Sequence, residues 1–189
     1  MIWLLILLIS SVVCQQSLEL INGTDELVVS NAEFHLTDID LDCPDGWERG
    51  ATKCFKVYQI ERSWPQALVF CTRYGSQLAK VESKKENEFI GRMLTKPQIN
   101  QMPRSDYWIG LVSNHRDDAD DMFMWSDGAV VSRYTGFWAK GQPDHSTGSC
   151  TKITINPHTS PLWKLSVCNI LLPFVCELPA CVKGRHPIN

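Results

Sequence analysis

Two stretches of the 189-residue chain space their hydrophobic side chains as amphipathic helices do. In the first, residues 63–66 (Ser-Trp-Pro-Gln) have the form of a capping box, and Gly75 supplies a stop. A second capping box at residues 83–86 opens a helix that we expect to end before Pro97. The side chains predicted to face inward are Trp64, Leu68, Cys71 and Tyr74 in the first helix, and Phe89, Ile90, Met93 and Leu94 in the second.

Short strands joined by loops are predicted for much of the remainder. Two helices followed mainly by strands indicate an α+β fold rather than a parallel wound sheet. Residues Val130–Lys164 are expected to hold only one strand and a long irregular loop. The predicted strands are Phe55–Tyr58, Tyr107–Val112, Cys150–Ile155 and Pro173–Leu178.

The chain begins with an apolar run from Ile2 to Val13, interrupted by two serines. At 12 residues this run is shorter than the roughly 20 that a bilayer-spanning helix needs. Val12 and Cys14 suit the positions before a signal-peptidase cut, so we expect residues 1–14 to be removed and the chain to be secreted. The alternative is an N-terminus that anchors the chain in a membrane. No later run is long and apolar enough to span one.

Charge is unevenly distributed along the chain. Residues 15–42 hold seven acids and no Lys or Arg, so they carry −7, and the remainder carries +4, for a net charge of −3. No basic run is dense enough to indicate nucleic-acid binding. We interpret residues 15–42 as an acidic extension, in which Asn22 is a predicted glycosylation site. Residues 43–178 then form one domain, and residues 179–189 a short tail.

The most specific feature is the order of cysteine and tryptophan motifs between Cys43 and Cys176. These motifs are Pro44-Asp45-Gly46-Trp47, Trp108-Ile109-Gly110-Leu111, Trp125-Ser126-Asp127-Gly128 and Gln142-Pro143-Asp144. Each motif alone is weak, but their joint order resembles the C-type lectin-like domain in its long form. The resemblance covers residues 43–178 and implies two helices packed on short antiparallel sheets, stapled by disulfides, with a long irregular loop region.

Eight cysteines suit an oxidising compartment. Six of them admit 15 pairings, among which the residues alone cannot choose. The resemblance implies the bonds Cys43–Cys54, Cys71–Cys176 and Cys150–Cys168. With Cys14 removed, Cys181 would be unpaired, and could link two copies in a disulfide-bonded homodimer or begin a further small domain.

The resemblance also identifies a candidate calcium and sugar site at Gln142-Pro143-Asp144. In calcium-dependent lectins of this family the triplet supplies two side-chain oxygens, with a cis bond before the proline. The glutamine-first order is associated with galactose-type sugars. Gln142 and Asp144 are therefore the candidate metal ligands, with calcium as the alternative to no cofactor.

Three departures from the family pattern argue against calcium. Gly148 and Ser149 stand where the family offers acidic ligands, Lys164 replaces an asparagine and Leu165 replaces an aspartate. A lysine ammonium near the ion would repel it. We therefore expect calcium to be replaced by an ion pair between Lys164 and Asp144.

The candidate ligand-binding residues lie in the loop region from Val130 to Lys164. Its charge is mainly basic, which suits an acidic partner, and exposed aromatics could anchor that partner. For Trp138 and Trp163 a place in the core is favoured over such a role. The candidates are Gln142, Asp144, Lys164, Tyr134, Arg133 and Lys140, and further members of the region are Phe137, His145, Lys152 and His158.

Two other possible sites are weaker. Four carboxylates between Asp117 and Asp121 could hold a cation, but lack the glycine turn and terminal glutamate of an EF-hand loop, so a solvated acidic loop is favoured. The five histidines show no His-x-x-x-His pair, and no nucleophile elbow appears, so the sequence does not indicate an enzyme.

Three functions remain open. The first is a secreted recognition module that binds an extracellular protein or glycan without the usual calcium coordination. The second is a calcium-dependent galactose-type lectin that uses Gln142 and Asp144. The third is a structural module of a larger extracellular or receptor protein.

Overall fold

The computed structural model describes residues 41–96, 104–113, 122–132, 134–156 and 158–182. These ranges hold the helices α1 (Trp64–Arg73) and α2 (Lys84–Thr95) and the 3-10 helix η2 (His145–Thr147). Their strands are β1 (Leu41–Asp42), β2 (Glu48–Arg49), β3 (Lys53–Arg62), β4 (Gln77–Leu78), β5 (Asp106–Ser113), β6 (Met122–Trp125), β7 (Val130–Ser132), β8 (Cys150–Asn156), β9 (Thr159–Ser166), β10 (Leu172–Pro179) and β11 (Cys181–Val182).

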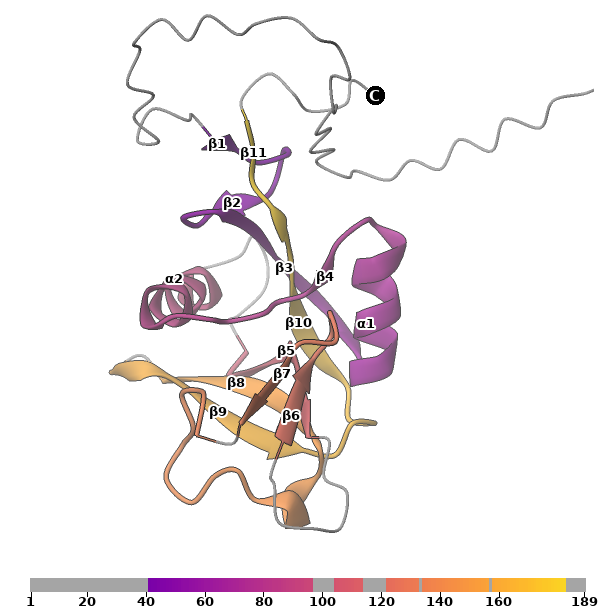
Figure 1. Ribbon diagram of the computed structural model, residues 1–189, viewed down its shortest axis with the longest axis vertical. Coiled ribbons are helices and arrows are strands. Elements are labelled where there is room, and N and C mark those ends of the chain that lie inside the picture. Colours follow the sequence, from indigo (N-terminus) through magenta and orange to yellow (C-terminus); the bar gives the residue numbers. More distant parts are fainter. Residues whose placement is uncertain (1–40, 97–103, 114–121, 133, 157, 183–189) are drawn as a thin grey trace, which may run out of the picture.

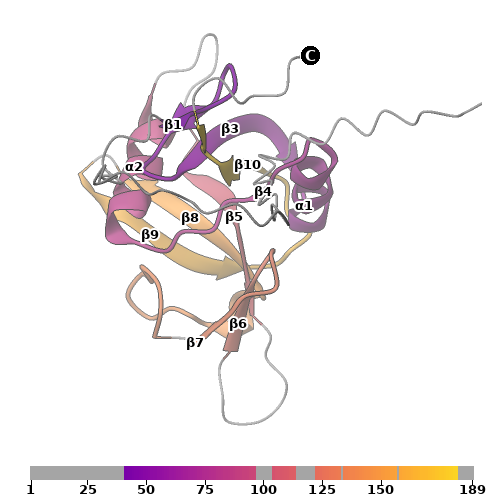
Figure 2. The same cartoon turned by 45° about the horizontal axis from the view of Figure 1, so that its top comes forward.

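The main sheet runs in the order β2-β3-β10-β5-β6-β7, with β4 added to β10 and the hairpin β8–β9 added to β5. The pairs are antiparallel apart from β10 and β5, which meet in parallel where Phe174 lies beside Trp108. The two helices flank strands β3 and β10 on opposite sides (Figures 1 and 2). The predicted α+β class is confirmed, with two helices packed on mainly antiparallel strands and stapled by disulfides.

Both helices begin at the predicted caps. Ser63 and Gln66 form the reciprocal hydrogen bonds of a capping box before α1, and the Ser83 hydroxyl accepts from the Glu86 amide before α2. Tyr74, expected to be buried, is 57% exposed. The helix ends at Arg73, so Tyr74 lies in its cap rather than on its inward face.

Helix α1 packs on a part of the core in which the buried indole groups of Trp64 and Trp108 donate hydrogen bonds to backbone carbonyls. The Trp64 indole N–H donates to the Ile109 carbonyl at 2.8 Å, and that of Trp108 donates to the Arg62 carbonyl at 2.9 Å. A buried tryptophan keeps its hydrophobic contribution only if this polar group finds a partner. Strand β5 and the end of β3 are thereby fixed relative to α1.

Helix α2 is joined to β9 through Asn87. The Asn87 amide donates to the Pro161 carbonyl at 2.8 Å and accepts from the Trp163 indole at 3.0 Å. Gly91 allows this close approach, since a Cβ there would lie 2.3 Å from the Pro161 ring. Strand β9 therefore lies directly against α2, with Trp163 fully buried.

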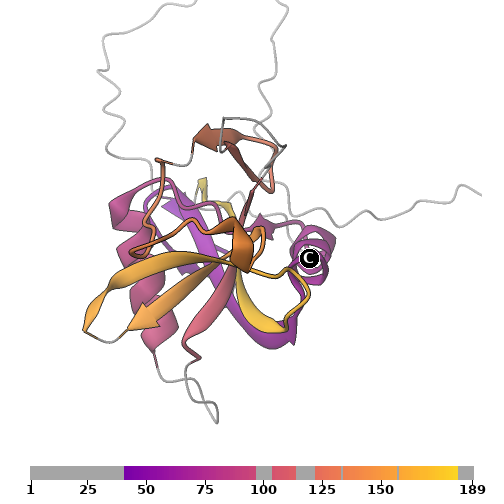
Figure 3. The same ribbon diagram turned by 90° about the horizontal axis from the view of Figure 1, so that it is seen from below.

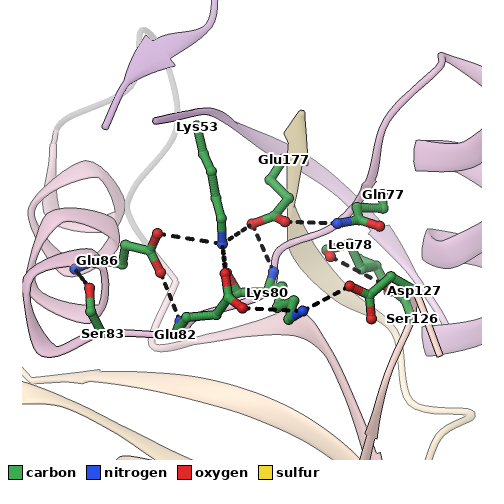
Figure 4. Close-up of polar contacts among 10 residues, drawn as sticks. All are labelled: Lys53, Gln77, Leu78, Lys80, Glu82, Ser83, Glu86, Ser126, Asp127 and Glu177. Carbon is green, nitrogen blue, oxygen red and sulfur yellow. Dashed lines mark hydrogen bonds and ion pairs between the residues drawn. The ribbon is translucent and has the colours of Figure 1, made fainter. Parts of the chain in front are cut away.

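A buried polar network closes the space between β3, β10 and α2 (Figure 4). The Lys53 ammonium donates to the Lys80 carbonyl at 2.8 Å and lies 2.8 Å from the Glu82 carboxylate and 3.4 Å from those of Glu86 and Glu177. Glu177 is only 3% exposed, and burial raises the pKa of its carboxyl to about 7.

Disulfides hold the two ends of the domain to its sheet. The structure contains the bonds Cys43–Cys54, Cys71–Cys176 and Cys150–Cys168. In the full chain Cys181 is disulfide-bonded, to a cysteine outside the described residues. The prediction that it is unpaired concerns a chain without Cys14 and stays a prediction. Cys181 lies in β11, which pairs with β1, so residues just beyond the predicted domain limits form a small sheet of their own.

The region from Val130 to Lys164 contains more strand than expected. It includes β7, β8 and most of β9, of which only β8 was predicted. Strand β9 was missed because Pro161 interrupts its pattern, and proline is uncommon within a paired strand. Here Pro161 lies where the register between β8 and β9 shifts, and its neighbours pair on either side.

Several predictions concern residues outside the described ranges. They are the leader at 1–14, most of the acidic extension with Asn22, the acidic cluster at 117–121, Arg133 and the tail from 183. In the part of the chain that the structure describes, neither helix is long and apolar enough to cross a membrane.

Candidate functional site

The loop between β7 and β8 packs against Trp163. Its backbone brackets this residue, because the Trp163 amide donates to the Phe137 carbonyl at 2.7 Å and the Ala139 amide donates to the Trp163 carbonyl at 2.9 Å. The rings of Phe137 and Trp138 meet the Trp163 ring edge-on, with centroids 5.3 and 5.7 Å away. The loop then passes across the ends of β8 and β9, where it forms η2 (Figure 3).

The Gln142–Pro143 peptide bond is cis, as the resemblance implied. The Gln142 side chain, however, turns toward the protein. Its carbonyl oxygen accepts from the Leu165 amide at 2.8 Å and from the Asp144 amide at 3.3 Å. This oxygen therefore holds the loop to β9 instead of facing outward.

Asp144 caps η2. Its carboxylate accepts from the Ser146 hydroxyl at 2.6 Å and from the Ser146 amide at 3.0 Å, and these bonds hold the pKa of the Asp144 carboxyl below its usual range. The Thr147 hydroxyl contacts the carbonyls of Asp144 and Leu165 at 2.7 and 3.1 Å. This cap could have been predicted from the sequence, because an aspartate side chain often accepts a hydrogen bond from the backbone amide two residues later, here that of Ser146.

The backbone after η2 has room only for glycine. Gly148 has a φ of 133°, and a Cβ there would lie 2.2 Å from the Ser166 carbonyl. An acidic ligand at this position would therefore require the loop to move away from β9. The missing acid before Cys150 is thus linked to how closely the loop packs.

The predicted ion pair between Lys164 and Asp144 is wrong. Within the described ranges Lys164 has no ion pair, and its neighbour across the hairpin is Lys152, which pairs with Asp106 at 3.0 Å. Side chains alternate along a strand, so Trp163 and Leu165 face the core while Lys164 lies on the other face. The Asp144 oxygen is already satisfied by Ser146.

These residues do not fit a calcium ion. Calcium takes six to eight oxygens, several of them from carboxylates. Asp144 is the single acid in the described residues from 134 to 176, and its Oδ1 is engaged, as is the Gln142 oxygen. The described ranges also contain no group of three His, Cys, Asp or Glu side chains that could hold a metal ion.

The outward surface of the loop combines an aromatic ring with basic side chains. Tyr134 is 89% exposed and Lys140 is exposed, while Lys164 is half-buried. Trp138 is half-buried against Phe123, with ring centroids 5.1 Å apart. Its indole nitrogen finds no hydrogen-bond partner among the described residues. We define the ligand face as Tyr134, Trp138 and Lys140, which all lie in the loop between β7 and β8. Lys164 is outside it, because it lies beside Lys152 on the other face of β9.

His145 ties this region to the end of β5. Its Nδ1 lies 3.1 Å from the Ser113 hydroxyl, and its ring lies 6.0 Å from that of Phe123 at an interplanar angle of 27°. His145 is thus half-buried rather than a loop-surface residue. Lys152 is occupied by Asp106, and His158 lies at the far end of the hairpin, in the turn between β8 and β9.

Comparison with known proteins bears on the whole domain. The family model for the lectin C-type domain matches residues 60–178. The alpha subunit of snaclec stejaggregin-A from Trimeresurus stejnegeri is 31% identical over 146 residues, which is 76% of this chain and 85% of the relative. The galactose-specific lectin nattectin from Thalassophryne nattereri is 30% identical over 138 residues, which is 71% of this chain and 79% of the relative.

Other matches are a much longer relative and two solved structures. C-type mannose receptor 2 from Mus musculus is 32% identical over 157 residues, which is 77% of this chain but only 10% of the receptor. Human lithostathine has a similar fold, with a TM-score of 0.62 at 23% identity over 79% of this chain and 99% of the other. So has a calcium-independent type II antifreeze protein, with a TM-score of 0.60 at 23% identity over 74% and 96% of the two chains.

Proposed function

This chain belongs to the C-type lectin domain family, and we propose that it is a secreted recognition module that binds an extracellular ligand without calcium. The observation that carries the proposal is the use of the Gln142 and Asp144 oxygens within the protein, on the Leu165 amide and on Ser146. A calcium ion would have to break these bonds and would gain one carboxylate. The family is generally non-enzymatic, which agrees with a binding role.

The ligand face favours a partner with acidic groups. Lys140 provides positive charge without an ion pair in the described ranges, and Tyr134 provides an exposed ring. Tyrosine is among the residue types that dominate binding energy at interfaces. An acidic protein surface or a negatively charged glycan would match this face.

A galactose-type lectin that depends on calcium is the second candidate. The Gln142-Pro143-Asp144 order and the 30% identity to the galactose-specific lectin nattectin favour it. A structural module of a larger protein is a further alternative, because the chain spans only 10% of C-type mannose receptor 2.

Retention of the secreted protein on a glycan array and on galactose beads, with excess calcium or with chelator, separates these functions. We expect no retention on galactose, and array binding that chelator leaves unchanged. Tyr134→Ala and Lys140→Ala should each weaken that binding, whereas Val69→Ala, an exposed apolar change on α1, should not. Galactose retention that chelator abolishes would instead establish the second candidate.

A further inference from the structure

The outward side of α2 carries a stripe of side chains that is separate from the ligand face. Lys85, Glu88, Phe89, Arg92 and Thr95 follow one another at spacings of three or four residues or their combinations. Residues so spaced share one face of a helix. This stripe borders the turn between β8 and β9 on one side and strand β2 on the other.

Two hollows open along this stripe, and Arg92 lines both. The first, of about 360 Å³, lies between α2 and the β8–β9 turn. The second, of about 310 Å³, lies between α2 and the residues that follow β2, with Lys85 and Arg49 on its wall. Both volumes fall within the range of ligand pockets, about 300–1,000 Å³. A linear polymer could occupy both hollows at once and contact the Arg92 guanidinium that lies between them.

The charge of this surface is positive, because its acids already have partners. Glu86 lies 3.4 Å from the Lys53 ammonium and accepts from the Glu82 amide at 2.7 Å. Glu88 pairs with Lys84 at 3.7 Å. Lys85 and Arg92, in contrast, are both exposed and take part in no ion pair within the described ranges. Glu88 lies between them on the stripe, but its charge is offset by Lys84, so the surface keeps the positive charge of Lys85 and Arg92.

The Arg92 guanidinium is held in position before any ligand arrives. It lies over the Phe89 ring at 5.7 Å from the centroid, and that ring packs against Phe55 at 5.8 Å. A cation fixed over an aromatic face loses less conformational freedom on binding. Its planar fork suits the oxygens of a sulfate or carboxylate, which can take two hydrogen bonds at once.

The first hollow adds groups that suit sugar hydroxyls. Its wall includes the Asn156 amide, the hydroxyls of Thr159 and Ser160, and the His158 ring, over a floor that includes the buried Pro161. Hydroxyl and amide groups above a small apolar surface can bind a sugar ring, while Arg92 binds an anionic substituent. We propose that this surface binds an anionic polysaccharide bearing sulfate or carboxylate groups. The site is independent of the proposed ligand face and would stand if that face bound nothing.

The test uses the secreted full chain and a sulfated heparin octasaccharide, with affinity measured by titration calorimetry. The double variant Lys85→Ala/Arg92→Ala should bind at least about tenfold more weakly. Thr159→Trp changes no charge but fills the first hollow, and should weaken binding at least about fivefold. It also carries the test if the double variant does not fold. Arg62→Ala/Arg73→Ala removes two charges beside α1, from the end of β3 and from the last turn of α1, and should stay within about twofold of wild type.

Further arms identify the chemistry of the ligand. Binding should fall with rising salt and be lost for the desulfated, neutralised octasaccharide, because exposed charges are screened. Equal losses in the Arg62/Arg73 and Lys85/Arg92 double variants would show attraction by net charge alone and would overturn the proposal. So would absence of binding by wild type, or wild-type affinity in Thr159→Trp. Polyglutamate that binds as tightly through the same residues would show an acidic-peptide site instead.

Discussion

Glu177 is a carboxylic acid in the interior of a domain whose other charges lie mostly near the surface. It accepts from the Gln77 amide and the Lys80 backbone, both at distances below 3 Å (2.8 and 2.9 Å), and lies 3.4 Å from Lys53. Burial nevertheless dominates and raises the pKa from 4.5 to about 7. The fold therefore favours the protonated acid over the carboxylate at mildly acidic pH.

The raised pKa of Glu177 predicts that the domain loses stability as pH rises. Since the folded-state pKa lies above the unfolded one, the contribution is complete below about 4.5 and is lost as pH increases through about 7. The loss is at most about 3 kcal/mol. Melting temperatures measured across this range should fall for wild type and fall less for Glu177→Gln, which is neutral throughout. Glu88→Gln, at the surface of α2, is the control, and a Glu177→Gln slope equal to that of wild type would contradict the interpretation.

The stability of the domain should be sensitive to the addition of a single methyl group at Gly148. The Cβ of Gly148→Ala would lie 2.2 Å from the Ser166 carbonyl at a φ of 133°, so we expect a loss of about 3 kcal/mol in the free energy of unfolding. Gly141→Ala is the matched control, because Gly141 also has a positive φ, 80°, but open space around it, and should cost about 1 kcal/mol. Denaturant unfolding compares the two, and equal losses would show that contact with β9 is unimportant.

At the scale of elements, α2 and β9 depend on one side chain. Asn87→Ala removes the partners of the Pro161 carbonyl and of the Trp163 indole, and should destabilise the domain by about 2–4 kcal/mol. Lys84→Ala removes only an exposed ion pair at 3.7 Å on the same helix and should change stability by less than about 1 kcal/mol. Thermal unfolding of the two variants tests this difference, and similar melting temperatures would contradict it.

The sequence predicted the elements that have strong local signals. The capping boxes located α1 and α2, and the strand patterns located parts of β3, β5, β8 and β10. Strand β9 was missed because Pro161 and the exposed Leu162 obscure its alternation, and it is identified by its pairing with β8 and the burial of Trp163. The same alternation places Lys164 away from Asp144, so an ion pair inferred from motif positions alone could not be correct. The sequence therefore located the loop of Gln142 and Asp144, but it did not predict that their side chains bond within the protein.

At the scale of the whole molecule, the two ends of the described domain come together. Strand β1 pairs with β11, and Cys181 in β11 is disulfide-bonded. Cys14 is the one cysteine outside the described residues. We therefore expect no thiol labelling of Cys181 in a secreted chain that keeps Cys14, and labelling in a chain that has lost residues 1–14. Mass spectrometry after alkylation without reduction measures this, with the reduced protein as the positive control. An alkylated Cys181 in an unreduced chain that keeps Cys14 would contradict this expectation, whereas alkylation found only after loss of residues 1–14 would support the predicted unpaired cysteine.

The central claim is that a domain of the C-type lectin family here works without calcium, because its loop oxygens are bound within the protein. Calorimetric titration of calcium into the disulfide-intact protein tests this most directly. No heat of specific binding is expected up to millimolar calcium, and the melting temperature should be the same with calcium and with chelator. Saturable binding of one ion, lost in Gln142→Ala and accompanied by a rise of several degrees in melting temperature, would contradict the claim.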